Sequence, residues 1–165
     1  MTSRRDRARL GRKTRGSAIA EFGPALWIIL FFFFFPMIDL LSVGMSYGFC
    51  MVLNYNQVHE ASLTPASQAT SPSGMVMQGI PNQWLNGMGH FVKMSGSPQT
   101  TITYRQGTTG ADGVTDLIVT LTTTVICNPF LTIPLPCVNV PGLNAPMNFT
   151  IVSERPMENP DDPNQ

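Results

Sequence analysis

The sequence has few of the side chains that catalysis and metal binding require. Only 12% of its 165 residues are charged, and it contains two histidines, His59 and His90, and three cysteines. No cluster of histidine and acidic residues has the spacing of a metal site, and no glycine-rich phosphate loop follows a strand. We therefore expect no catalytic residues, no metal and no cofactor. An envelope enzyme that uses His59 or His90 is the weakest of the hypotheses left open.

Charges of the two signs are unevenly distributed, although the formal net charge is zero. Seven basic residues and one acid precede Gly16, whereas three basic residues and nine acids follow it. Because the basic block directly precedes an apolar run, it predicts a cytoplasmic N-terminus and a chain that otherwise lies outside the cytoplasm. A nucleic-acid-binding arm is the alternative for a basic run. The block is short and its position explains it, so we expect no nucleic-acid partner.

Residues 22–41 form the longest apolar run and include five consecutive phenylalanines, Phe31 to Phe35. The length of the run matches the roughly 20 residues that a helix needs to cross a bilayer. Pro36 interrupts the run and predicts a kink, and we expect Asp39 to reach the outer interface. The sequence therefore predicts one membrane-spanning helix in contact with lipid.

The junction between the basic block and the apolar run holds Gly16, Ser17 and Glu21. A charge at the centre of a bilayer costs at least ~2.5–3.5 kcal/mol, so Glu21 must stay near the interface or meet a positive partner. The arrangement Arg-Gly-Ser-Ala-Ile-Ala-Glu-Phe over residues 15–22 resembles a type IV prepilin leader. That resemblance implies cleavage after Gly16, a new amino terminus at Ser17, and pairing of this amine with Glu21 of a neighbouring subunit. An ordinary uncleaved signal anchor is the alternative.

The wider chain resembles the TadE-like minor pilins, or pseudopilins, of the tight-adherence (Flp) pilus system. The likeness rests on residues 15–22, Pro24, and residues 37–39, 58–69, 117–125, 128–131 and 153–158, whereas residues 23–27 and 59–63 depart from the family pattern. It implies a protein of the inner (cytoplasmic) membrane without enzymatic activity that helps to assemble an adhesive pilus. Its expected partners are a prepilin peptidase, other pilin or pseudopilin subunits and the pilus assembly platform.

The rest of the sequence predicts an α+β fold in four parts. These are a leader over residues 1–16, a membrane-spanning and extended helix over 17–64, a small extracytoplasmic domain over 65–155 and a flexible tail over 156–165. The turn-rich residues 65–74 are expected to form a loop. Tyr47, Met51, Tyr55 and Val58 recur at helical spacing, which predicts one apolar face on the extended helix.

The domain is expected to contain one amphipathic helix and a short antiparallel sheet. The helix is predicted over residues 81–94, with Trp84, Leu85, Met88, Phe91 and Val92 facing the core. Strands are predicted over residues 100–105, 114–127 and 147–154. In the second strand, Leu117, Val119, Leu121, Val125 and Cys127 alternate with threonines. Prolines across residues 128–146 exclude a central strand there.

The three cysteines are Cys50, Cys127 and Cys137. Outside the cytoplasm, Cys127 and Cys137 are expected to form a disulfide that closes the proline-rich loop, with about 3 kcal/mol of stabilisation from chain entropy. Two buried thiols are the alternative. Cys50 is expected to stay free within the helix packing.

Overall fold

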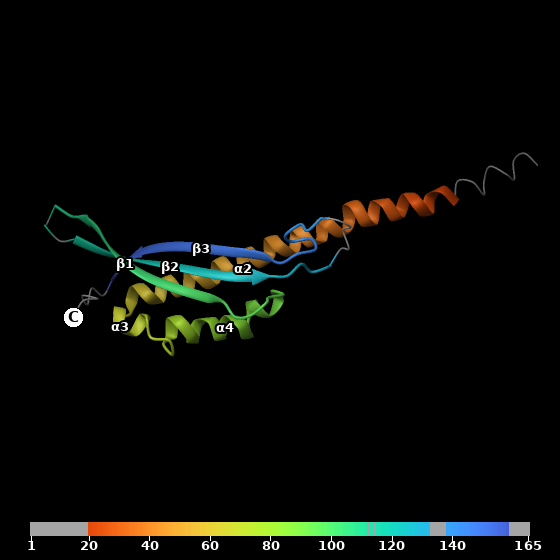
Figure 1. The fold of residues 1–165 in the computed structure, drawn as a ribbon. Helices are drawn as coiled ribbons and strands as arrows, with labels where there is room; N and C mark the ends of the chain where they lie inside the picture. Colours follow the sequence, from red (N-terminus) through yellow and green to blue (C-terminus); the bar gives the residue numbers. More distant parts are fainter. Residues whose placement is uncertain (1–19, 112, 114, 133–137, 159–165) are drawn as a thin grey trace, which may run out of the picture.

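The computed structural model describes residues 20–111, 113, 115–132 and 138–158. One continuous helix runs from Ala20 to Leu63. Its first part projects from the molecule, and its second part, α2 (Phe35–Leu63), continues along a small domain (Figure 1). The predicted α+β fold, with a long apolar helix followed by a small domain, is confirmed.

The sheet consists of β1 (Gln99–Thr109), β2 (Thr115–Cys127) and β3 (Met147–Pro156) in the order β1-β2-β3, with both pairs antiparallel. The predicted strand positions are correct, but the outer strands are longer than predicted. β1 passes Arg105 and continues through an irregularity between Gln106 and Thr109, because Thr109 still pairs with Thr115.

The central strand alternates as its sequence predicts. The buried face toward α2 carries Val119, Leu121, Val125 and Cys127. Thr120, Thr122 and Thr124 lie on the other face. Thr123 is also fully buried, since it shares the face of Leu121 and Val125. The alternation of β2 places Thr123 on this face, between Leu121 and Val125, although only the apolar residues of the strand were predicted to form it.

The predicted apolar face of the extended helix is not the face that packs on the sheet, except at Val58. Tyr47, Met51 and Tyr55 are exposed by 44%, 48% and 62%. The face of α2 that packs on the sheet instead carries Ser46, Cys50, Leu53, Asn54, Gln57, Val58 and Ala61. Polar side chains can occupy this face because they find hydrogen-bond partners there.

The second helical region begins earlier and ends earlier than predicted. A π-helical segment, η2 (Met75–Gly79), leads into α4 (Ile80–Asn86), and a 3-10 turn, η3 (Met88–Phe91), follows. Gly87, with φ −108° and ψ −112°, ends the α-helix. The turn redirects the chain, so Trp84 and Val92 are buried as predicted, whereas Met88 and Phe91 are exposed. The predicted loop before this region contains a short helix, α3 (Ala66–Ala69).

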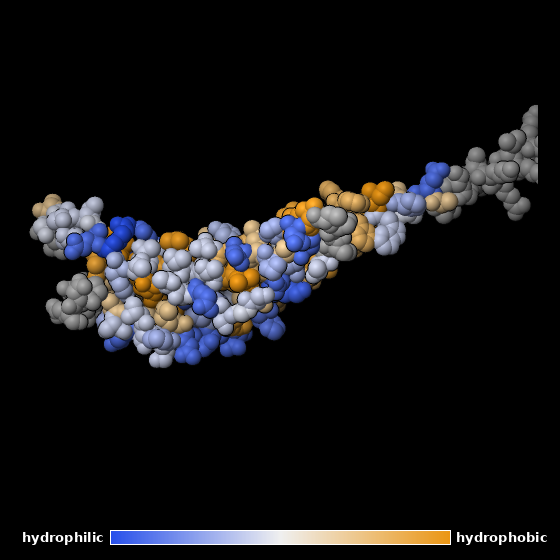
Figure 2. Space-filling view, in the orientation of Figure 1, coloured by the Kyte–Doolittle hydropathy of each residue, from blue (hydrophilic) through white to orange (hydrophobic). Residues whose placement is uncertain are grey.

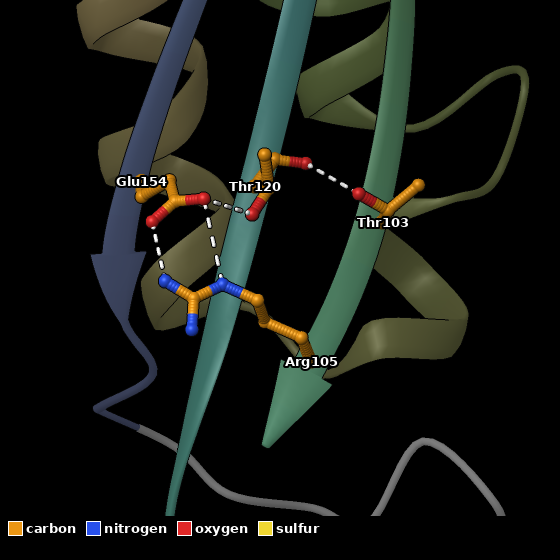
Figure 3. A network of polar contacts seen from close by, with 4 residues as sticks. All are labelled: Thr103, Arg105, Thr120 and Glu154. Atoms are coloured by element: carbon orange, nitrogen blue, oxygen red, sulfur yellow. Dashed lines mark hydrogen bonds and ion pairs between the residues drawn. The ribbon is translucent and has the colours of Figure 1, made fainter. Parts of the chain in front are cut away.

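The domain has two layers, because α2 and α4 pack on the same side of the sheet (Figure 1). The opposite face of the sheet carries a polar network, shown in Figure 3. Arg105 on β1 reaches across β2 to Glu154 on β3, with 2.6 Å between Nη2 and Oε2. Thr120, between them on β2, donates a hydrogen bond of 3.1 Å to Glu154 Oε1. This network joins the three strands on the face without helices.

Candidate functional site: the long helix and its contacts

The residues predicted to direct processing lie at or before the beginning of the described chain. Gly16 and Ser17 fall outside the described residues, and so does Cys137, the predicted disulfide partner of Cys127. Glu21 lies in the first described turn of the helix and is exposed. It directly precedes the apolar run, as the sequence requires.

The first half of the helix has an exposed apolar surface. Its exposed large side chains are Phe22, Leu26, Trp27, Ile28, Ile29, Phe32, Phe33, Phe34, Met37, Leu40 and Leu41. These residues surround the helix rather than forming one stripe, and Figure 2 shows hydrophobic residues gathered where the helix leaves the domain. A helix rises 1.5 Å per residue, so about 20 such residues reach roughly 30 Å. The helix is long and apolar enough to cross a membrane.

The backbone hydrogen bonds of the helix change to a π-helical pattern just before Pro36, but the helix continues past this residue. Leu30–Phe34 form a π-helical segment, η1, and the N–H of Phe35 bonds to the carbonyl of Leu30. A proline in a helix has no N–H to donate and its ring crowds the carbonyl four residues earlier. The wider π turn just before Pro36 accommodates this loss. We expected a kink here, and the structure shows a local π segment inside a continuous helix.

Beyond the exposed part, the described residues of the connection between β2 and β3 include two that lie against α2, Leu131 and Gly142. Asp39 is fully buried, and its Oδ1 accepts a hydrogen bond of 2.7 Å from the backbone N–H of Leu131. Pro129 is also buried, and an added Cβ at Gly142 would lie 3.2 Å from Val43. Asp39 therefore attaches the connection to the helix. We had expected its side chain to reach an interface, and this expectation is wrong.

Farther along α2, a buried polar seam joins the helix to the sheet. Asn54 Nδ2 donates to the carbonyls of Leu121 and Ile151 and to Thr123 Oγ1, at 3.3, 3.1 and 3.1 Å. Gln57 Oε1 accepts a hydrogen bond of 3.0 Å from Thr123 Oγ1. Asn54 Oδ1 is buried without a hydrogen-bond partner among the described residues, so the pairing of this side chain rests on its Nδ2. The bonds of Nδ2 and of Gln57 fix the rotation of α2 relative to the sheet.

Gln57 extends the same seam toward the second helical region. Its Nε2 donates to the carbonyl of Val76 at 2.8 Å and to Thr100 Oγ1 at 3.0 Å. Trp84 Nε1 donates to the carbonyl of Phe49 at 2.9 Å and so connects α4 to α2. The extended helix is thus the element on which the rest of the domain packs.

Cys50 and Cys127 meet in the interior between α2 and β2. Both are buried and belong to one apolar cluster with Leu53, Trp84 and Val125. The Cys50 thiol hydrogen-bonds the sulfur of Cys127 and lowers the pKa of the Cys127 thiol, against the opposing effect of burial. The neighbour of Cys127 in the described chain is therefore Cys50. The predicted pairing of Cys127 with Cys137 remains a prediction.

The two histidines lie apart. Nδ1 of His59 lies 2.6 Å from Nη1 of Arg155, and His90 lies beside the ring of Phe91. Within the described residues, no group of three or more histidine, cysteine or acidic side chains could hold a metal ion. No protein-family model, curated protein or solved structure matches the chain.

Proposed function

We propose that the chain is a minor pilin, or pseudopilin, that helps to assemble a tight-adherence type IV-like pilus. The observation that carries the proposal is the single helix from Ala20 to Leu63. Its first part exposes apolar side chains on all sides, and its second part forms the interior of an α+β domain. Such a helix connects the domain directly to the membrane segment. A pilin needs this connection, because the whole subunit must leave the bilayer and enter the filament.

The leader supplies the chemistry of this proposal. The basic block keeps the N-terminus in the cytoplasm, so the domain lies outside the inner membrane. A prepilin peptidase cleaves between Gly16 and Ser17. The new amine at Ser17 then pairs with Glu21 of an adjacent subunit, and a misplaced subunit is rejected because it leaves a buried charge unpaired.

The exposed apolar residues of α2 offer a surface to other subunits beyond the membrane. Tyr47, Met51 and Tyr55 recur along one side of the helix and remain accessible. Gly44 and Gly48 lie near them, and an added Cβ at either position would meet nothing within 4 Å. This surface continues the apolar part of the helix onto the domain, where a neighbouring pilin helix or the assembly platform can pack.

The processing step is tested with two glycine substitutions in the full chain, expressed with and without a prepilin peptidase. We expect wild type to lose residues 1–16 only when the peptidase is present, as measured by mass spectrometry. Gly16→Leu should prevent this loss. Gly11→Leu places the same change within the leader but away from the junction, and should leave cleavage intact. A mature protein that retains Met1 would contradict the proposal and favour an uncleaved, signal-anchored envelope protein with a structural or binding domain.

The assembly step is tested at Glu21. Glu21→Val should insert into the membrane and be cleaved normally, but fail to restore pilus assembly in a strain that lacks the chain. Glu21→Asp keeps the charge and should restore assembly in part. Normal assembly with Glu21→Val would show that this carboxylate is not the contact between subunits.

A further inference from the structure

We propose that Cys50 and Cys127 form a disulfide that joins the extended helix α2 to the end of strand β2. This bond is a covalent link between the membrane-anchoring element and the sheet of the outer domain. It differs from the local pairing of Cys127 with Cys137 that the spacing in the sequence suggests.

The geometry of the two elements brings these thiols together. Cys127 is the last residue of β2 and lies on the face that packs against α2, two positions after the buried Val125. Successive side chains of a strand point to opposite faces, so this placement directs the Cys127 thiol toward the helix. Cys50 lies on the buried face of α2, one turn from Leu53 and Asn54. Both side chains belong to the same buried cluster, and both are free thiols in this structure.

The surroundings favour a stable bond once it has formed. Cys50 and Cys127 are exposed by 0% and 2%, and the same cluster contains Trp84, Phe149 and Ile151. Thiol–disulfide exchange requires an attacking thiolate to reach a sulfur atom. Because apolar side chains cover both sulfurs, external reductants cannot reach the bond in the folded protein.

The oxidation needs a disulfide-bearing oxidant, of the thiol–disulfide oxidoreductase class, acting before the domain closes over the cysteines. The thiolate of Cys127 attacks the oxidant's disulfide, forms a mixed disulfide and releases one thiolate of the oxidant. Cys50 then loses its proton and attacks the sulfur of Cys127, which expels the oxidant's second sulfur. The protein gives up two electrons and two protons, and the oxidant becomes a dithiol.

Formation of this bond in the cell rests on the location of the domain outside the cytoplasm, which is part of the proposed function. The deciding experiment therefore uses the purified full chain in detergent, where location has no influence. The reduced chain is unfolded and then refolded into detergent with oxidised and reduced glutathione at an oxidising ratio, so that the oxidant reaches the cysteines before the domain closes. Its remaining thiols are alkylated under denaturing conditions, and the digest is mapped by mass spectrometry without reduction.

We expect a linked peptide pair that contains Cys50 and Cys127, with alkylated Cys137. Cys137→Ser should keep this link unchanged, whereas Cys50→Ser should lose it. A Cys127–Cys137 link in wild type, or alkylation of all three cysteines, would overturn the inference. Because wild type alone decides the result, a folding defect in either variant does not affect the conclusion.

This outcome is separable from that of the pilin proposal. A chain cleaved after Gly16 whose cysteines all react with the alkylating reagent would retain the pilin function and exclude the link. A chain that keeps Met1 but contains the Cys50–Cys127 pair would exclude processing and retain the link.

Discussion

The carboxylate of Asp39 on the long helix and the backbone N–H of Leu131 are joined by a hydrogen bond of 2.7 Å, although 92 positions separate them in the chain. This contact holds the segment after β2 against the helix at the end of its apolar part nearer the sheet. Asp39 is fully buried beneath this segment, while its neighbours Leu40 and Leu41 remain 64% exposed. The covered and the exposed parts of the helix meet within one turn.

Replacement of Asp39 by alanine should release the chain around Leu131. The N–H of Leu131 then loses its acceptor, which costs about 1–2 kcal/mol. We expect hydrogen exchange at Leu131 to become roughly 5–30 times faster, as measured by NMR on the full chain in detergent. Asp39→Asn keeps an oxygen acceptor and should change the rate far less. Equal exchange rates in Asp39→Ala and wild type would show that this bond does not hold the segment.

The buried seam at Asn54 should contribute strongly to stability. Asn54→Ala removes donors from two backbone carbonyls and from Thr123, and leaves a cavity between α2 and the sheet. We expect the free energy of unfolding to fall by about 2–4 kcal/mol, measured by chemical denaturation in detergent. Asn56→Ala, on the exposed side of the same helix, is the matched control and should stay within about 0.5 kcal/mol of wild type. An equal decrease in the free energy of unfolding in the two variants would show that the hydrogen bonds of Asn54 do not stabilise the fold.

Two glycines should respond to alanine in opposite directions. At Gly89 an added Cβ would lie 2.5 Å from the ring of Trp84, so Gly89→Ala must displace a buried aromatic side chain and should cost about 1–3 kcal/mol. At Gly48, inside α2, an added Cβ meets nothing within 4 Å. Gly48→Ala should therefore stabilise the helix by about 0.5–1 kcal/mol. Thermal unfolding of the purified chain measures both effects, and a stabilising Gly89→Ala would contradict the packing around Trp84.

The polar network on the open sheet face should be sensitive to acid. Hydrogen bonds from Arg105, and secondarily from Thr120, lower the pKa of Glu154 below its ordinary value of 4.5. A lowered folded pKa means that Glu154 stabilises the fold above pH 4.5, and that this contribution is lost as the pH falls through the folded pKa.

Carboxyl NMR titration of Glu154 tests this assignment. Arg105→Met should raise the pKa of Glu154 toward its ordinary value, and Thr120→Val should raise it by less, since the arginine is the larger cause. An unchanged pKa of Glu154 in Arg105→Met would show that the ion pair is not formed in solution.

Several elements could be predicted from the sequence because they depend on residues that are close together along the chain. A run of apolar residues long enough to cross a bilayer predicts a helix in any context. The alternation of Val119, Leu121 and Val125 with threonines predicts a strand with one buried face, and the structure confirms it. The position of Glu21 immediately before the apolar run likewise follows from the order of residues alone. What these residues do in assembly stays a prediction.

The same patterns could not predict which side of α2 faces the sheet, or that Cys127 lies in one buried cluster with Cys50. The spacing of apolar side chains placed Tyr47, Met51 and Tyr55 on one face of the helix, but did not show that this face is exposed. The buried face carries Asn54 and Gln57, and the sheet supplies acceptors for Asn54 Nδ2 and a donor for Gln57 Oε1.

The sequence by itself determined that this protein has a block of basic residues before a membrane-length apolar helix, and a β-rich region after it, since composition and periodicity are properties of neighbouring residues. Only the tertiary structure decided which side of the helix faces the sheet, that Asp39 lies beneath the β2–β3 connection, and that Cys127 lies against Cys50. These contacts join residues that are distant along the chain, and their energies depend on partners that no local pattern specifies.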